Sequence, residues 1–437
     1  MRPYELTAAA ASDLIARKEL SCEELTRSCL ERISDRDPVV RAWTHVDPEQ
    51  AIRHARELDR QPPRSPLHGI PFGIKDVIDT ADLPTTHNSP IYIGHRVGRD
   101  AACVAVVRHS GGVILGKTDT VEFACAGRRA LTRNPHNLAH TPGGSSSGSA
   151  AAVADLMCPL AFGTQTGGSL IRPASYTGIY AFKPTAGLVS REGAKMYSQT
   201  LDTIGWYGRS IADLRLVAGV FRLPQADEAT GFDPDRLRIG VCRTPYWDRA
   251  EAAGRDALEF ATRQLERAGV EIRSVELADD FGKLARAHEI IMHGEGRAAF
   301  LPEYLGHYER LHQDFRDHVE NAKMITPRMM ADAYDLAARC RAEFDRLFAT
   351  GVDAILTLAT PGVAPEGYHF TGDIIFTAFW TLLHVPALCV PAGPGENGLP
   401  IGIQLIGPRF GDLALLDVGE AVAPLLDVSP ARHPVSG

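Results

Sequence analysis

After residue 68 the apolar residues gather in short runs that glycine interrupts, and this pattern predicts buried strands. Strands that read as continuous apolar runs are typical of a largely parallel sheet covered by helices. We expect such strands at residues 69–77, 112–116, 158–162, 352–358 and 387–391. Helical patterning is found at 101–109, at 149–156 and through 250–350. The alternation of the two patterns predicts an α/β fold.

The N-terminal residues carry two helix-start signals. Ser21-Cys22-Glu23-Glu24 is a capping box, and Asp47-Pro48-Glu49-Gln50 places proline in the first turn of another helix. We therefore expect the first sixty residues to be mostly helical. The long uncharged stretch 374–392 contains Pro386 and Pro391. Because proline interrupts a helix, this stretch predicts a helix followed by a strand rather than a membrane span.

No internal repeat or clean linker divides the chain, which predicts a single domain over residues 1–437. Within it we expect four successive parts. They are an N-terminal helical segment (1–60), a catalytic core (61–225), a helical substrate-side region (226–350) and a C-terminal return to the core sheet (351–437).

Composition and charge exclude several classes of protein. The chain has 46 Lys and Arg against 54 Asp and Glu, a formal net charge of −8, so we expect neither nucleic acid nor a membrane as a partner. A hydrophobic share of 44% excludes a disordered or fibrous chain. The eight cysteines form no CxxC pair, and the N-terminus lacks an apolar signal core. We expect reduced thiols and a cytoplasmic location.

Three local motifs suggest other chemistry, and the context argues against each. Residues 111–118 have the letters of a P-loop, but the expected strand lies inside the motif and a helix precedes it. Residues 144–148 match a nucleophile elbow without the apolar strand that should lead into it. His288 and His293 stand five residues apart on the expected helix, about 140° around its axis, and cannot share a metal.

Lysine is scarce in this chain, with seven in all, and Lys75 lies inside the apolar run 69–78. Burial disfavours the ammonium form, lowers the pKa towards neutrality and turns the amine into a base. The alternative is an ion pair with Asp76 or another carboxylate, which would keep Lys75 charged. The sequence leaves both open.

Two segments rich in Gly, Ser and Thr follow, at 141–149 and 163–169. Glycines allow backbone N–H groups to converge on one point, as an oxyanion hole requires. Flexible or phosphate-binding loops have the same composition, so these segments alone do not establish catalysis.

Taken with Lys75, these segments resemble the amidase signature family of Ser-cisSer-Lys amidohydrolases. The resemblance runs from about Leu14 to the segment 398–404, and the wording of 141–188 and 201–205 is most similar to the malonamidase branch. It implies one large α/β domain with a mixed, mostly parallel sheet covered by helices on both faces.

The resemblance also implies the roles of individual residues. Ser169 would be the nucleophile, Ser145 the bridging serine on a cis peptide after Gly144, and Lys75 the terminal base. Ser146 would support the site by hydrogen bonding towards Lys75. The implied oxyanion hole consists of the backbone N–H groups of Thr166, Gly167, Gly168 and Ser169. The implied reaction proceeds through an acyl-enzyme and needs no metal or organic cofactor.

Three positions depart from the commoner wording of the family. Gln165 stands where most members have aspartate, and Ser147 replaces a glycine. Arg172 stands three residues after the nucleophile, and in the malonamidase branch that arginine holds a substrate carboxylate. This predicts a small carboxylate-bearing amide such as malonamate. The alternative is a structural ion pair.

The function we expect is therefore that of an amidase acting on linear amide C–N bonds. One alternative is a broader aryl or alkyl amide, ester or carbamate hydrolase, with Phe379 and Trp380 lining an apolar pocket. Another is the glutaminase subunit of a tRNA-dependent amidotransferase, in which partner proteins bind the tRNA. The expected partners are a small-molecule amide and, by resemblance, a second copy in a homodimer.

Overall fold

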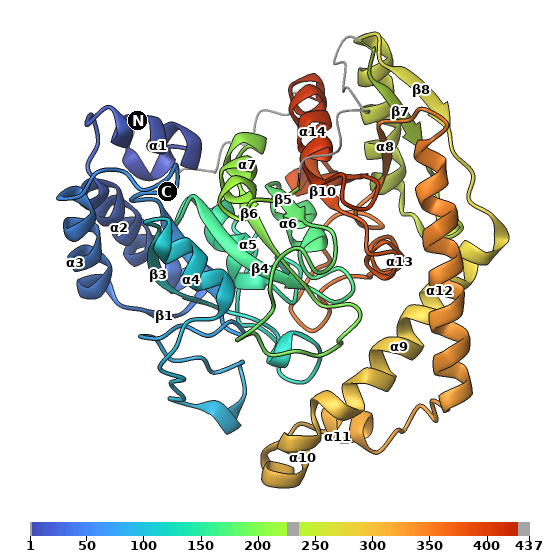
Figure 1. Ribbon diagram of the computed structural model, residues 1–437, viewed down its shortest axis with the longest axis horizontal. Helices are drawn as coiled ribbons and strands as arrows, with labels where there is room; N and C mark the ends of the chain where they lie inside the picture. Colours follow the sequence, from blue (N-terminus) through green and yellow to red (C-terminus); the bar gives the residue numbers. More distant parts are fainter. Residues whose placement is uncertain (1, 225–235, 427–437) are drawn as a thin grey trace.

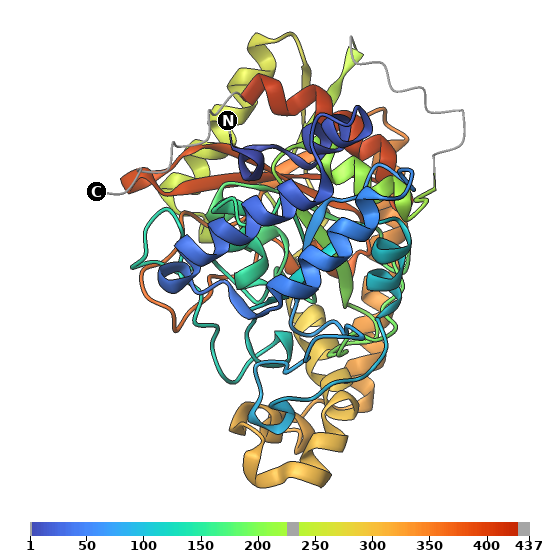
Figure 2. The same cartoon turned by 90° about the vertical axis from the view of Figure 1, so that its left-hand side faces the viewer.

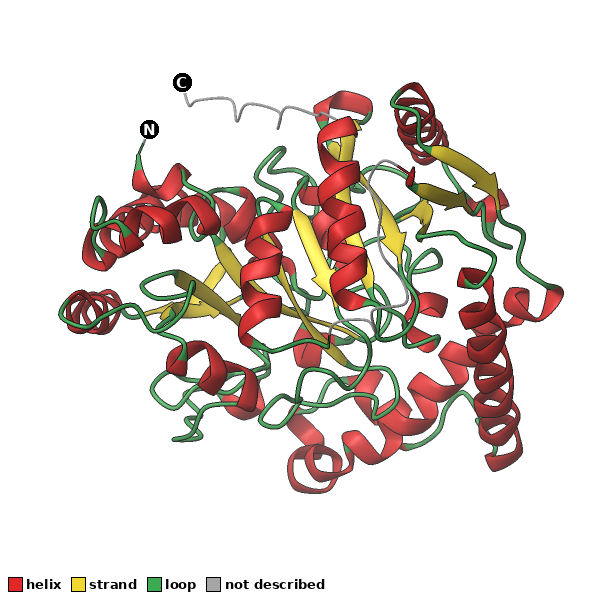
Figure 3. Ribbon diagram, turned by 45° about the horizontal axis from the view of Figure 1, so that its top comes forward, coloured by secondary structure: helices red, strands yellow, loops and turns green. Residues whose placement is uncertain are grey.

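An 11-stranded mixed sheet crosses the molecule, and helices cover both of its faces (Figures 1 and 3). The computed structural model describes residues 2–224 and 236–426. The strands lie in the order β1-β3-β2-β4-β6-β5-β10-β11-β9-β7-β8. They are β1 (Trp43–Val46), β2 (Pro71–Lys75), β3 (Val113–Thr118), β4 (Leu160–Gln165), β5 (Tyr180–Lys183), β6 (Thr203–Gly208), β7 (Arg238–Val241), β8 (Glu271–Ser274), β9 (Ala354–Leu358), β10 (Ala387–Pro394) and β11 (Pro400–Ile406).

The described chain also forms fourteen α-helices. They are α1 (Ala8–Ala16), α2 (Cys22–Val40), α3 (Pro48–Asp59), α4 (Ala102–His109), α5 (Ser147–Ala154), α6 (Ile171–Thr177), α7 (Ile211–Val220), α8 (Ala252–Arg267), α9 (Leu284–Ala299), α10 (Leu301–His307), α11 (Gln313–Val319), α12 (Pro327–Phe348), α13 (Ala378–Leu382) and α14 (Asp412–Leu426). One continuous sheet makes this a single α/β domain, as predicted. The boundary expected between 225 and 226 lies outside the described residues.

The expectation of a mostly parallel sheet is wrong. Only four of the ten strand pairings in the described chain are parallel, those of β2 with β3 and β4 and those of β7 with β8 and β9. Strands β5 and β6 run antiparallel to their neighbours, and β10 and β11 form a hairpin. Most central strands are buried on both faces, so apolar residues occur on both faces and the sequence carries no signal of strand direction.

The predicted helix starts are confirmed. Helix α2 begins after Ser21, whose hydroxyl accepts the Glu24 N–H while the Glu24 carboxylate accepts the Ser21 N–H. Helix α3 begins at Pro48, and the Asp47 carboxylate accepts the Gln50 N–H. Strand β1 lies between these two helices and was not expected. It pairs antiparallel with β3 and forms one edge of the sheet.

Two of the ambiguous segments also have the predicted structure. The P-loop-like residues 111–118 contain β3, and α4 precedes them. The uncharged stretch 374–392 contains α13 and most of β10. Across residues 2–224 and 236–426, no helix combines the length and the apolar character needed to cross a membrane.

Helices α9 to α12 extend from the sheet as a long arm (Figures 1 and 2). Helices α9 and α12 pack along each other, and α10 and α11 lie at the far end of the arm. At the end nearer the sheet, α9 packs against α13. This contact places α9 and α13 together beside the loop that follows β4.

Candidate active site

Lys75 is the last residue of β2 and is fully buried in the interior of the sheet. Its Nζ donates hydrogen bonds to Ser145 Oγ at 2.8 Å and to Thr164 Oγ1 at 2.6 Å. Strand β2 lies between β3 and β4, and Thr164 belongs to β4. The amine is therefore held by two hydroxyl groups from different segments.

The alternative of an ion pair for Lys75 fails, because Asp76 is already engaged. The Asp76 carboxylate forms an ion pair with Lys117 Nζ at 3.0 Å and accepts the Thr86 N–H. Within the described chain no carboxylate forms an ion pair with Lys75. Burial holds the pKa of Lys75 well below its ordinary value, and the negative charge of Asp202 offsets this only in part. Hydroxyl groups and the absence of a paired carboxylate among the described residues thus favour the uncharged form of this amine.

Ser145 follows a Gly144–Ser145 peptide bond that is cis, as the resemblance implies. A hydrogen bond from Ser146, the next residue along the chain, towards Lys75 was expected. Ser146 bonds to the backbone of Thr164 instead. Its hydroxyl donates to Thr164 O at 3.1 Å and accepts the Thr164 N–H at 3.2 Å. Ser146 thus fixes the backbone of the residue whose side chain holds Lys75, and its support for the amine is indirect.

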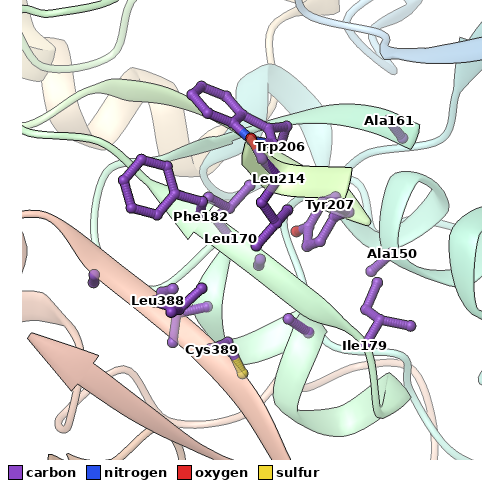
Figure 4. Close-up of a cluster of buried hydrophobic side chains, with 14 of the residues drawn as sticks. Ala150, Ala161, Leu170, Ile179, Phe182, Trp206, Tyr207, Leu214, Leu388 and Cys389 are labelled. Carbon is purple, nitrogen blue, oxygen red and sulfur yellow. The ribbon is translucent and has the colours of Figure 1, made fainter. Parts of the chain in front are cut away.

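Ser169 lies in the loop between β4 and α6, and the next residue, Leu170, anchors that loop. Leu170 points into a buried cluster with Phe182 and Trp206 (Figure 4). A Cβ on Gly163 or on Gly205, which pair across β4 and β6, would come within 2.6 or 2.5 Å of a Leu170 methyl group. The two glycines therefore leave the space that Leu170 fills.

The backbone N–H groups of residues 166–169 are without acceptors among the described residues. None of the four donates a hydrogen bond to any acceptor in residues 2–224 or 236–426. The Ser169 hydroxyl likewise makes no hydrogen bond within those residues. Lys75 is thus hydrogen-bonded directly to Ser145, and Ser169 lies in a loop whose N–H groups at residues 166–169 have no acceptor among the described residues.

Gln165 braces the start of the helix that follows the nucleophile loop. Its Oε1 accepts the N–H groups of Leu170 and Ile171, both at 3.0 Å, and its Nε2 donates to Thr381 Oγ1. These N–H groups have no partner within α6 because they lie at its first turn. A side-chain oxygen serves this purpose without a negative charge, so glutamine can take the place of aspartate here.

Arg172 forms no ion pair with any described residue, which excludes the structural ion pair considered above. Its Nη1 donates to Gly372 O, and its Nη2 donates to Gly144 O at 2.5 Å and to Thr371 Oγ1 at 3.1 Å. Only 4% of the side chain is exposed, and burial lowers its pKa to about 10. It is a buried cation whose bonds run to backbone oxygens and a hydroxyl beside the serine loop.

Phe379 and Trp380 pack against other aromatic side chains. Both are buried, Phe379 against Tyr246 at 5.5 Å between ring centroids and Trp380 against Phe344 at 5.2 Å. They pack the junction between α13 and the helical arm.

Sequence reasoning missed a buried carboxylate beside the nucleophile loop. Asp202 accepts a hydrogen bond from Thr166 Oγ1 at 2.6 Å and accepts the N–H groups of Tyr197 and Ser198. Burial raises its pKa, and these hydrogen bonds offset the shift in part. The run 201–205 contained Asp202, but nothing in its pattern indicated the partner.

Comparison with known proteins decides the family. Residues 24–416 match the family described as Amidase. The chain belongs to the amidase family.

This amidase is an amide-hydrolysing enzyme, and its relatives span its whole length. A glutamyl-tRNA(Gln) amidotransferase subunit from Chloroflexus aggregans is 35% identical over 97% of both chains. The corresponding subunit from Roseiflexus castenholzii is 36% identical over 97% of this chain and 96% of its own. Among solved structures, the native peptide amidase of Stenotrophomonas maltophilia is 29% identical over 100% of both chains, with a TM-score of 0.80.

These relatives overturn the expectation about partners. A small-molecule substrate, a homodimer and no nucleic acid were expected, yet the first two relatives are named as subunits of an amidotransferase for a tRNA-bound substrate. Net charge describes the surface of one chain and says nothing about an assembly in which other subunits meet the nucleic acid. The inference from charge was therefore wrong for this amidase.

Proposed function

We propose that this amidase cleaves its substrate through an acyl-enzyme on Ser169, with Ser145 and Lys75 as a proton relay. The observation that carries the proposal is the fully buried Lys75 amine, which has no carboxylate partner in the described chain and bonds to Ser145 Oγ at 2.8 Å. A neutral amine in that position is a base for the serine hydroxyl. The family and the free N–H groups around Ser169 support the same assignment.

The reaction begins with two coupled proton transfers. Lys75 Nζ accepts the proton of Ser145, Ser145 Oγ accepts the proton of Ser169, and Ser169 Oγ attacks the carbonyl carbon of the amide. The N–H groups of residues 166–169 stabilise the oxyanion that forms. This mechanism requires a hydrogen bond from the Ser169 hydroxyl to Ser145 Oγ in the substrate complex, where catalytic hydrogen bonds often tighten.

Collapse of the tetrahedral intermediate breaks the C–N bond. Ser145 donates its proton to the leaving nitrogen and regains one from Lys75, and ammonia or an amine departs. A water molecule then attacks the acyl-enzyme, and its proton passes to the relay. The carboxylic acid leaves, and the Ser169 hydroxyl is restored.

For the substrate, we propose an amide with a carboxylate close to the scissile carbonyl, as in the malonamidase branch. Support comes from Arg172, a buried guanidinium with no carboxylate partner among the described residues, whose Nη2 bonds to Gly144 O, next to Ser145. Its hydrogen bonds within residues 2–224 and 236–426 use three of its five N–H groups, and the Nε–H is buried there without an acceptor. An anionic substrate would balance this charge.

A second candidate is favoured by the relatives. Identity of 35% along nearly the whole of an amidotransferase subunit supports a role as the ammonia-releasing component of a larger enzyme.

The test measures ammonia release from malonamate, propionamide and glutamine by wild type, Ser169→Ala and Arg172→Gln. Ser169→Ala should abolish release from every amide, and normal turnover in that variant would contradict the nucleophile. Arg172→Gln should lower kcat/KM for malonamate by about 30-fold or more, the equivalent of about 2 kcal/mol, and leave propionamide little changed. Equal losses on both would exclude a carboxylate anchor, and release from glutamine alone would favour the second candidate.

A further inference from the structure

The loop that carries Ser169 has a consistent polarity along its backbone. The N–H groups of residues 166–169 are free within the described chain, whereas each of the four carbonyl groups of these residues accepts a hydrogen bond. Gly168 O accepts the N–H of Arg172 at 3.0 Å, and Ser169 O accepts Tyr207 Oη at 3.3 Å. In a peptide unit the C=O and N–H point in opposite directions, so a carbonyl fixed on one side turns the next N–H to the other.

The other two carbonyls are held by helices outside the catalytic core. His288 of α9 donates its Nε2–H to Thr166 O at 2.9 Å, and Thr381 of α13 donates its hydroxyl to Gly167 O at 2.9 Å. Both side chains are buried, with exposed fractions of 2% and 1%. These carbonyls belong to the peptide units that supply the N–H groups of Gly167 and Gly168.

Thr381 Oγ1 has three hydrogen-bond partners, and one of them decides where the hydroxyl proton points. Thr381 Oγ1 accepts the Gln165 Nε2–H at 3.0 Å, so its own proton is left to point at a carbonyl. Thr377 O, one turn earlier, lies at 3.2 Å, and Gly167 O is the nearer acceptor.

The segment that leads into α13 also packs closely against the two glycines of the loop, with His288 of α9 beside it. A Cβ on Gly168 would come within 2.3 Å of Thr377 Oγ1, and a Cβ on Gly167 within 2.9 Å of Ile374 Cδ1 and 3.5 Å of His288 Cε1. Only glycine permits this approach. Any shift of α9 or α13 is therefore felt by the peptide units of the loop.

We propose that His288 and Thr381 are positioning residues that orient the oxyanion-binding N–H groups of this amidase. The inference rests on the proposed acyl transfer at Ser169. Neither side chain touches the reacting atoms; each fixes a carbonyl and thereby aims the N–H of the same peptide unit at the developing negative charge. The helical arm thus contributes to catalysis through α9.

The experiment grades the donor at position 381 through Thr381→Ser, Thr381→Cys and Thr381→Val. The hydroxyl is kept in the first, replaced by a weak S–H donor in the second and removed in the third. We expect kcat on a common amide to stay within about threefold of wild type for serine and to fall about 10- to 100-fold for valine, with cysteine between. KM should change little, because the ground state makes little use of the oxyanion hole.

A second measurement separates an effect on the orientation of the N–H groups from an effect on the stability of the fold. An alkyl boronic acid that forms a tetrahedral adduct on Ser169 should lose affinity in parallel with kcat along the same series. His288→Leu should behave like Thr381→Val, and His288→Gln, which keeps an N–H donor, should recover part of the loss. Thr357→Val is the matched control, because its buried hydroxyl has no hydrogen-bond partner in the described chain. Its kcat should equal that of wild type.

Two results would overturn the proposal and leave the acyl-enzyme intact. One is an equal kcat across the serine, cysteine and valine series in protein that remains folded. The other is a fall in thermal stability in which kcat per folded molecule and boronate affinity do not change. If Thr381→Val does not fold, four other variants still test the proposal. They are Thr381→Ser, Thr381→Cys, His288→Leu and His288→Gln. If wild type forms no boronate adduct, the acyl-transfer mechanism itself fails.

Discussion

Two fully buried lysines lie on the neighbouring parallel strands β2 and β3, and their amines have different partners. Lys75 is in register with Thr118, and its neighbour Ile74 is in register with Lys117. Lys117 has Asp76 at 3.0 Å and Thr85 Oγ1 at 2.7 Å, whereas the hydrogen bonds of the Lys75 amine run to hydroxyl groups.

Burial lowers the pKa of both amines, but the carboxylate of Asp76 works against this for Lys117. Residue type and burial are equal, so the position of a single carboxylate decides between a structural ion pair and a base. The difference shows that the role of a buried lysine must be inferred from the groups that contact its amine.

The largest effect is expected from Lys75→Met. Removal of the base should lower kcat/KM by about 10²- to 10⁴-fold, because the Ser169 proton then has no acceptor beyond Ser145. The fold should survive, since an apolar side chain replaces an unpaired amine in an apolar strand. Steady-state kinetics and thermal unfolding measure the two. Turnover near the wild-type rate would remove Lys75 from the mechanism.

The converse is expected for Lys117→Met. Loss of one partner leaves Asp76 buried and unpaired, which should lower the free energy of unfolding by about 3–5 kcal/mol. The protein that remains folded should retain its kcat. Urea unfolding with an activity assay on the folded fraction tests this, and the double variant Asp76→Asn/Lys117→Met should recover part of the loss. A large drop in kcat with normal stability would mean that the two lysines are not distinct.

A smaller difference should appear in the pH dependence of stability. The pKa of Lys75 in the folded protein lies below 10.5, its ordinary value. At a pH between the folded-state pKa and 10.5, the unfolded chain binds one more proton at Lys75 than the folded protein does. The free energy of unfolding therefore rises with pH through that window. The cost of the buried amine is largest below the folded-state pKa and disappears above 10.5.

Lys75→Met lacks this contribution. Its stability relative to wild type should be greatest near neutral pH and should decline as pH rises, while other groups, including Lys183, cancel in the difference. Unfolding measured at a series of pH values gives the comparison. A difference that stays constant with pH would show that Lys75 keeps its ordinary pKa.

Sequence reasoning found the main chemical groups of the candidate site because their signals are local. Lys75 stood out as a rare lysine in an apolar run, and the serine-rich and glycine-rich segments carried the family resemblance. Helix starts such as Ser21 and Asp47 were found for the same reason, since a capping box spans only four residues.

The missed features depend on contacts between distant parts of the chain. His288 bonds to a residue 122 positions away and Thr381 to one 214 positions away, and neither has a local pattern that distinguishes it from a core residue. Thr164 was one threonine among several in its segment until the structure placed it against Lys75. Strand direction was missed because strands buried on both faces are apolar whichever way they run.

The hole that Gly163 and Gly205 leave for Leu170 has a consequence for how such enzymes diversify. In the proposed mechanism the loop of the attacking Ser169 is held by Leu170, whose side chain lies in the buried core. The opposite side of the catalytic loop can then be rebuilt for new acyl groups while the direction of attack stays constant. If the core-facing side of this loop stays constant while the opposite side varies in sequence, a single fold can hydrolyse amides as different as a peptide and a small acid.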